Sequence, residues 1–105
     1  TEATDEAGHD KNYFKKIEMI EKFDREILEP IKKFYLQHRD DLRILILPDH
    51  PTPVRLGYHT NGLVPFIICG AGINSGQNDI FSEFIKPDFT FNSGTELLHY
   101  FLKLK

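Results

Sequence analysis

The chain has 105 residues, enough for one small domain, and 40% of them are hydrophobic and 28% charged, as in ordinary globular proteins. Its formal net charge of -3 provides no basic field for nucleic acid, and no stretch approaches the roughly 20 apolar residues of a membrane span. Composition therefore excludes disorder and argues against nucleic acid and membranes as partners.

The N-terminal segment, Thr1 to Asp5, has no starting methionine, no basic stretch and no apolar stretch. This predicts a cut end rather than a signal peptide or a translation start. The single cysteine, Cys69, lies in the apolar run that begins at Phe66, so we expect a buried structural thiol. A cytoplasmic, reducing location fits this cysteine usage best.

From Tyr13 to Tyr35, apolar residues recur mostly every three or four positions, which predicts one long amphipathic helix. Pro30 removes one backbone donor and should kink or split this helix. The exposed face would carry acidic and basic residues at the favourable four-residue spacing. These pairs are Glu21 with Arg25 and Glu29 with Lys33.

The next segment, Leu42 to Leu47, is nearly continuous in apolar residues and ends at Pro48. Such a run is typical of a strand buried on both faces of a mostly parallel sheet. A second buried strand is predicted from Val64 to Cys69, and residues 70–92 form an irregular connection. A helix followed by buried strands predicts an α/β fold.

The C-terminal segment begins with the capping-box sequence Ser93 to Glu96, and apolar residues then follow at helical spacing. This predicts a final helix from about Thr95.

Three short segments carry side chains that bind metal ions in other proteins. Asp5 and His9 are four positions apart, so they face one point if the turn between them is helical. Asp49 and His50 follow the first predicted strand and are flanked by prolines, and His59 precedes the second strand. Carboxylate and imidazole together suit manganese, zinc, iron or cobalt better than calcium. Each segment taken alone is also typical of ordinary turn or surface residues.

The segment Thr4-Asp5-Glu6-Ala7-Gly8-His9 resembles the Asp-x-x-x-His metal motif of cofactor-independent phosphoglycerate mutases, which belong to the alkaline phosphatase superfamily. Residues Leu45 to Arg55 closely match the Asp-His segment of the archaeal-type branch. His59-Thr60 followed by Val64-Pro65-Phe66 matches the segment after it. The resemblance runs from Thr4 to about Gly72, with the three motifs in the family's order.

The resemblance implies that Asp5, His9 and His59 bind one divalent metal ion, and that Asp49 and His50 bind a second one. Manganese is expected, with zinc, magnesium or cobalt as alternatives. Arg55 would bind a phosphate or carboxylate, or would be a solvated strand residue. Residues 1–105 would then be one C-terminal fragment of a phosphatase-like metalloenzyme domain. Its fold would be α/β, part of a mostly parallel, alkaline-phosphatase-like sheet flanked by helices.

The activity implied for the parent enzyme is an isomerase reaction of glycolysis and gluconeogenesis. It interconverts 3-phosphoglycerate and 2-phosphoglycerate through a phosphoserine. None of Ser75, Ser82 and Ser93 matches the family's nucleophile motif, so the isolated chain should be inactive. The alternatives are another phosphatase or phosphomutase of the superfamily, or a non-catalytic metal-binding or interaction domain. Incomplete cover of the strands predicts a homo-oligomer or a contact with the remainder of the parent enzyme.

Overall fold

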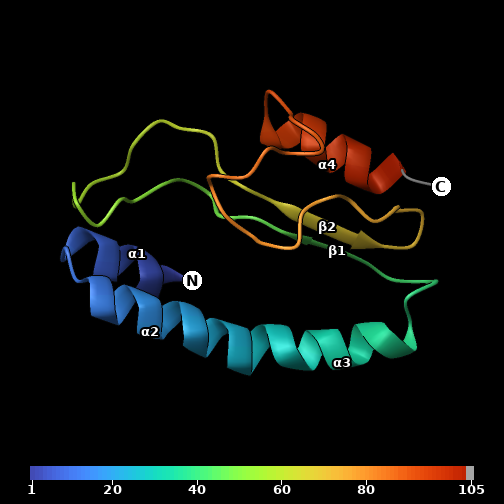
Figure 1. The fold of residues 1–105 in the computed structure, drawn as a ribbon, viewed down its shortest axis with the longest axis horizontal. Coiled ribbons are helices and arrows are strands. Elements are labelled where there is room, and N and C mark those ends of the chain that lie inside the picture. Colours follow the sequence, from blue (N-terminus) through green and yellow to red (C-terminus); the bar gives the residue numbers. More distant parts are fainter. Residues whose placement is uncertain (104–105) are drawn as a thin grey trace. The chain divides into compact units, whose positions relative to one another are not determined.

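The computed structural model describes residues 1–103, which form helices and two short strands (Figure 1). They divide into two compact units. The first unit comprises Thr1–Gln37 and Asp49–Leu63, and the second comprises His38–Pro48 and the residues from Val64 onward. Within residues 1–103, no helix is both long enough and apolar enough to span a membrane.

The first unit is built on a helical hairpin followed by a long helical run (Figure 1). The short helix α1 spans Glu2–His9, and α2 spans Tyr13–Phe23. The Asn12 side chain caps α2 by accepting a 2.9 Å hydrogen bond from the Lys15 amide. The two helices pack side by side. The final helix of this unit, α3, spans Glu29–Gln37.

The predicted helix from Tyr13 to Tyr35 is confirmed as one helical run, but it contains a widened turn. This π-helical turn, η1, spans Asp24–Leu28, and the Glu29 amide donates to the carbonyl of Asp24. Pro30 has no amide hydrogen to donate, so the ladder of hydrogen bonds is perturbed immediately before it, and the helix neither breaks nor splits there.

The charged pairs predicted on this helix have different outcomes. Glu29 and Lys33 form an ion pair of 3.0 Å within α3. Within the part of the chain that the structure describes, Glu21 and Arg25 form none, because Arg25 lies in the widened turn and no longer sits one regular turn from Glu21. The apolar face of this helix is largely exposed within residues 1–103, with Phe14 at 88%.

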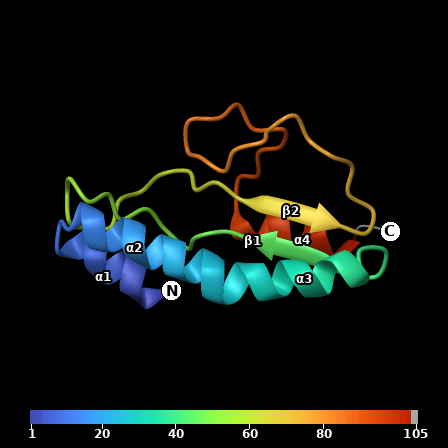
Figure 2. The same ribbon diagram turned by 60° about the horizontal axis from the view of Figure 1, so that its bottom comes forward.

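The second unit contains the two strands, which pair antiparallel (Figure 2). Strand β1 spans Arg43–Ile46 and β2 spans Ile67–Gly70, so both are shorter than predicted. The expected parallel pairing is not observed in this pair. A parallel pair requires a crossover connection, usually a helix, and residues 47–66 form none. The observed architecture is mixed α and β with a two-stranded antiparallel sheet.

Both strands are half-buried along their whole length rather than buried on both faces. A continuous apolar run indicates burial only when layers cover both sides, and a two-stranded sheet covers little of its own surface. Cys69 in β2 is therefore half-buried instead of fully buried. Its partial burial still raises the pKa of the thiol.

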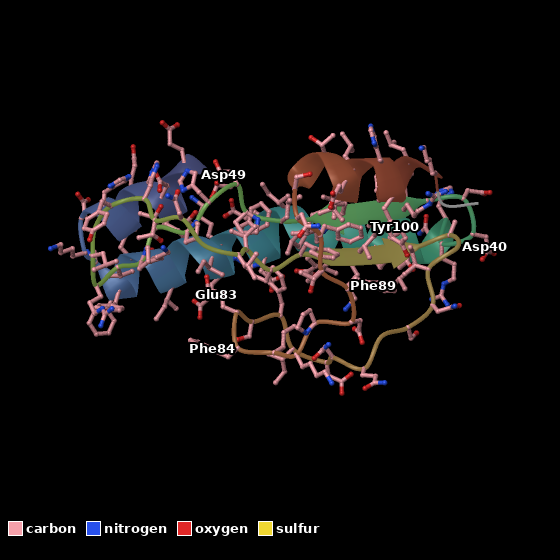
Figure 3. The ribbon with its side chains drawn as sticks, turned by 90° about the horizontal axis from the view of Figure 1, so that it is seen from above. Asp40, Asp49, Glu83, Phe84, Phe89 and Tyr100 are labelled. Atoms are coloured by element: carbon pink, nitrogen blue, oxygen red, sulfur yellow. The ribbon has the colours of Figure 1, made fainter. Side chains whose placement is uncertain are left out.

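The final helix, α4, spans Gly94–Lys103, which confirms the predicted C-terminal helix. The Glu96 amide donates to the Ser93 hydroxyl at 3.2 Å, and the Glu96 carboxylate accepts from the Asn92 amide at 2.9 Å. This is a variant of the capping box in which the Glu96 carboxylate accepts from the residue before Ser93 rather than from the Ser93 amide. Leu97 is buried, and the ring of Tyr100 lies with its centroid 5.9 Å from that of Phe89 and 5.3 Å from that of Phe91. Figure 3 labels Tyr100 and Phe89.

Candidate metal centre

The first two candidate ligands lie one turn apart on α1. Because α1 is helical through Glu2–His9, Asp5 and His9 project from the same face. Nε2 of His9 lies 3.2 Å from Oδ2 of Asp5. The sequence predicted that Asp5 and His9 face one point if the turn between them is helical, and this turn is helical.

The third candidate ligand, His59, reaches the same point from the loop that follows Pro51. The Thr60 amide donates to the Pro51 carbonyl at 3.1 Å, which folds this loop back on itself. Nε2 of His59 lies 3.2 Å and 3.3 Å from the two carboxylate oxygens of Asp5, and 3.0 Å from Nε2 of His9. Asp5, His9 and His59 thus bring one ligand atom each within 4.8 Å of one another.

Gly8 allows this loop to approach α1 closely. A Cβ at position 8 would lie 2.8 Å from the Thr52 carbonyl oxygen and 2.9 Å from its Cγ2. Real Cβ atoms essentially never come that close to another heavy atom. A side chain at this position would push the loop, and with it His59, away from Asp5 and His9.

A hydrogen bond to the backbone fixes the orientation of the His9 ring. Its Nδ1 lies 2.9 Å from the Gly57 carbonyl oxygen, which can only accept, so Nδ1 carries the hydrogen. In the neutral ring, Nε2 then presents its lone pair toward Asp5 and His59. Such a bond from the far ring nitrogen to a carbonyl is how metal-binding histidines are usually held. Either a proton on Nε2 of His59 or a cation among the three side chains satisfies this lone pair.

Asp5 is held in its charged form. The Thr52 hydroxyl donates to Oδ1 of Asp5 at 2.5 Å, and this bond is the main reason that the pKa of Asp5 falls from 3.8 to about 2. The hydrogen bond to His59 and the charges of His9 and His59 lower it further, against partial burial. The carboxylate is therefore ionised at neutral pH, as a metal ligand must be.

The second candidate pair, Asp49 and His50, lies beside this group. The ring of His50 stacks on that of His59 with centroids 3.7 Å apart. Nε2 of His50 is 3.4 Å from Oδ2 of Asp49, whose side chain is 86% exposed. Asp49 contacts His50 and lies outside the three-residue group. Arg55 is exposed and makes no hydrogen bond or ion pair with the candidate ligands.

The donor set fits a divalent metal ion. Two imidazoles and a carboxylate converge, and their side chains remain 43%, 50% and 30% exposed for His9, His59 and Asp5. Three protein ligands with an open side are typical of a catalytic site, where a further position is left for water or substrate. Thr52 and the Gly57 carbonyl also belong to this site. Spacing alone did not reveal them, although Thr52 stands two residues after His50 in the same proline-flanked loop.

The chain belongs to the Metalloenzyme superfamily, whose family model matches residues 1–97. This agrees with the motifs at Asp5 to His9, Asp49-His50 and His59.

The curated relatives include 2,3-bisphosphoglycerate-independent phosphoglycerate mutases of archaea. The chain is 39% identical to the enzyme of Methanothrix thermoacetophila over 82 residues, which are 78% of this chain and 21% of that protein. It is 46% identical to the Methanosarcina acetivorans enzyme over 67 residues, 64% of this chain and 17% of that protein. A third relative, mutase 2 of Methanothermobacter thermautotrophicus, is 40% identical over 83 residues, 79% of this chain and 20% of that protein. The chain spans about a fifth of the length of these relatives. No solved structure matches the chain.

Proposed function

We propose that this chain is the metal-binding part of a cofactor-independent phosphoglycerate mutase of the archaeal type. The parent enzyme interconverts 3-phosphoglycerate and 2-phosphoglycerate in the cytoplasm, as a step of glycolysis and gluconeogenesis. The observation that carries this proposal is the convergence of Asp5, His9 and His59 on one point. The ring of His50 packs against the ring of His59 beside this point. The names of the relatives supply the substrate.

In this proposal Asp5, His9 and His59 hold one divalent ion, and Asp49 and His50 hold the second. Manganese is the preferred ion, with zinc, magnesium and cobalt as alternatives. Two such ions supply the positive charge that stabilises the attacking and leaving oxygens of a phosphoryl transfer. The chain's own groups prepare the site. Asp5 is kept ionised, and the Gly57 carbonyl holds His9 in the tautomer that presents Nε2.

Arg55 is proposed to meet the phosphate or carboxylate of the substrate. Its guanidinium is exposed and not engaged by the candidate ligands, so its donors remain available. The phosphoserine of the parent reaction would be formed on a residue outside this chain's serines, since none of them stands in the family's nucleophile motif.

Two experiments test the proposal at separate levels. Calorimetric titration of the 105-residue chain with manganese should give binding that His59→Ala weakens at least tenfold. The substrate is tested with a chimera in which this chain replaces the matched segment of the Methanothrix thermoacetophila enzyme. In an enolase-coupled assay, the chimera should convert 3-phosphoglycerate, and His9→Ala should abolish conversion.

The same experiments separate the alternatives. Metal binding by the chain without turnover by a folded chimera would favour another phosphatase or phosphomutase activity, because the ligands are shared more widely than the substrate. Absence of both would leave an interaction domain and contradict the proposal.

A further inference from the structure

Thr52 lies between the two groups of proposed metal ligands. Thr52 is only 6% exposed and is the one buried polar residue in the described part of the chain. The hydroxyl oxygen is 2.5 Å from Oδ1 of Asp5 and 3.2 Å from Nδ1 of His50. Asp5 belongs to the first proposed ion and His50 to the second, so one hydroxyl contacts a ligand of each.

The direction of these two hydrogen bonds follows from proton counting. A threonine hydroxyl has one hydrogen, and an ionised carboxylate can only accept. The 2.5 Å separation is that of a charge-assisted O–H···O bond, so the hydrogen of Thr52 points to Asp5. The opposite arrangement would press two acceptor oxygens together. Nδ1 of His50 must therefore be the donor in the second bond.

This fixes the tautomer of His50. With the hydrogen on Nδ1, the neutral ring presents the lone pair of Nε2, which lies 3.4 Å from Oδ2 of Asp49. A metal ion binds the deprotonated nitrogen, so this is the tautomer that the second ion requires. The hydroxyl thus prepares both groups, keeping Asp5 charged and His50 turned the right way.

The position of Thr52 is itself fixed from two helices. Nζ of Lys16 on α2 donates to the Thr52 carbonyl at 2.6 Å. On α1, the absence of a side chain at Gly8 lets the Thr52 backbone and methyl group lie against the helix. The hydroxyl is therefore held in place before any ion binds, which lowers the cost of ordering the ligands.

We propose that Thr52 is a positioning residue that couples the two metal-ligand groups, by donating to Asp5 while accepting from His50. This inference rests on the proposed function, because it assigns both groups to metal ions. It predicts that loss of the hydroxyl weakens binding of both ions, whereas a residue serving one group would affect one ion only. Loss of a hydrogen-bond partner of a metal ligand typically costs about 10- to 100-fold in affinity.

Cobalt binding to the 105-residue chain tests this coupling, because the visible absorption of cobalt reports its ligand geometry and calorimetry reports affinity and stoichiometry. Thr52→Val removes the hydroxyl at nearly constant volume, and Thr52→Ser restores it. Thr60→Val is the matched control, the same change in the same loop at a hydroxyl that makes no hydrogen bond to the candidate ligands.

We expect Thr52→Val to weaken both cobalt ions by about 10- to 100-fold and to alter the spectrum. Thr52→Ser and Thr60→Val should behave like the unaltered chain. If the unaltered chain binds cobalt and Thr52→Val binds both ions equally well, the coupling is refuted while the proposed function stands. If the unaltered chain binds no ion, the coupling is refuted, and turnover by the chimera then decides the proposed function separately.

A second measurement needs neither metal nor variant. Nitrogen-15 NMR of the histidine rings in the metal-free chain distinguishes the two neutral tautomers. His50 should carry its hydrogen on Nδ1, and Thr52→Val should shift it toward Nε2. A hydrogen on Nε2 of His50 in the unaltered chain would overturn the proposal even if the valine variant failed to fold.

Discussion

Replacing Gly8 by alanine should loosen the attachment of the Thr52 loop to α1. The added Cβ would meet the Thr52 carbonyl oxygen at 2.8 Å, its Cγ2 at 2.9 Å and Nζ of Lys16 at 3.2 Å. Two of these three neighbours are backbone or a short branched side chain, which cannot turn away. The loop and the helix would therefore have to separate by about half an ångström.

The expected magnitude follows from two opposing terms. Overpacking at a close contact costs about 1–3 kcal/mol, and Gly→Ala in a helix returns about 0.4–1 kcal/mol by restricting the unfolded chain. The net effect at Gly8 should be a loss of between about 0 and 2.6 kcal/mol in the free energy of unfolding, centred near about 1.3 kcal/mol. Gly94→Ala is the matched control, because Gly94 also lies in a helix and a Cβ there meets nothing within 4 Å.

Urea unfolding followed by circular dichroism measures both variants. Gly94→Ala should raise the transition midpoint slightly and Gly8→Ala should lower it. Because the loop carries His59, Gly8→Ala should also weaken metal binding, which Gly94→Ala should leave unchanged. If Gly8→Ala proves as stable as Gly94→Ala and binds metal as the unaltered chain does, the close approach is not needed to assemble the site.

Three further outcomes are expected. Burial raises the pKa of the Cys69 thiol, so at pH 8 iodoacetamide should alkylate Cys69 more slowly than it alkylates free cysteine. Alkylation of Cys69 should become faster when urea unfolds the chain, and equal rates with and without urea would contradict this. The 105-residue chain alone should show no turnover of 3-phosphoglycerate, because no serine stands in the nucleophile motif; turnover that His50→Ala abolishes would refute this. The apolar side chains of α2 are exposed, Phe14 at 88% and Ile17 at 55%, and should drive association of the chain. Light scattering across a dilution series should therefore detect an oligomer. A monomer of 12.2 kDa at every concentration would contradict this.

The helical run from Tyr13 and the final helix were predictable because their signals are local, whereas α1 was not predicted. The spacing of apolar residues from Tyr13 to Tyr35 and the capping box at Ser93 depend only on neighbours a turn away, and both helices are observed. Pro30 is also a local signal, and it indicated where the helix is perturbed. The widened turn that precedes it was not predicted. A missing donor identifies where a helix is perturbed but does not say whether it kinks, splits or widens.

Strand pairing was not predictable in the same way. The apolar runs at β1 and β2 indicate strands correctly, but their direction depends on the connection between them. A crossover helix in residues 47–66 would have favoured a parallel pair, and its absence was available in the sequence as a proline-rich, non-periodic stretch. Burial on both faces was inferred from the runs alone, and the structure leaves both strands half-buried.

For the candidate site, spacing predicted only that Asp5 and His9 face one point. The family resemblance implied that His59 joins them, and neither indicated what orients these side chains. Asp5, His9 and His59 meet because α1 is helical and the loop after Pro51 returns to it. The hydrogen bonds from Thr52 to Asp5 and from His9 to Gly57 depend on contacts across about fifty residues, for which the sequence holds no periodic signal. Assignment of these side chains to metal ions stays a prediction.

X-ray absorption spectroscopy of the chain loaded with one equivalent of zinc tests that assignment most directly. We predict nitrogen and oxygen neighbours at about 2.0–2.2 Å with the multiple scattering of at least two imidazoles. His59→Ala should remove one imidazole from this signal. A sulfur neighbour at about 2.3 Å, which only Cys69 or the single methionine could supply, or a spectrum without imidazole scattering would contradict a metal site at Asp5, His9 and His59.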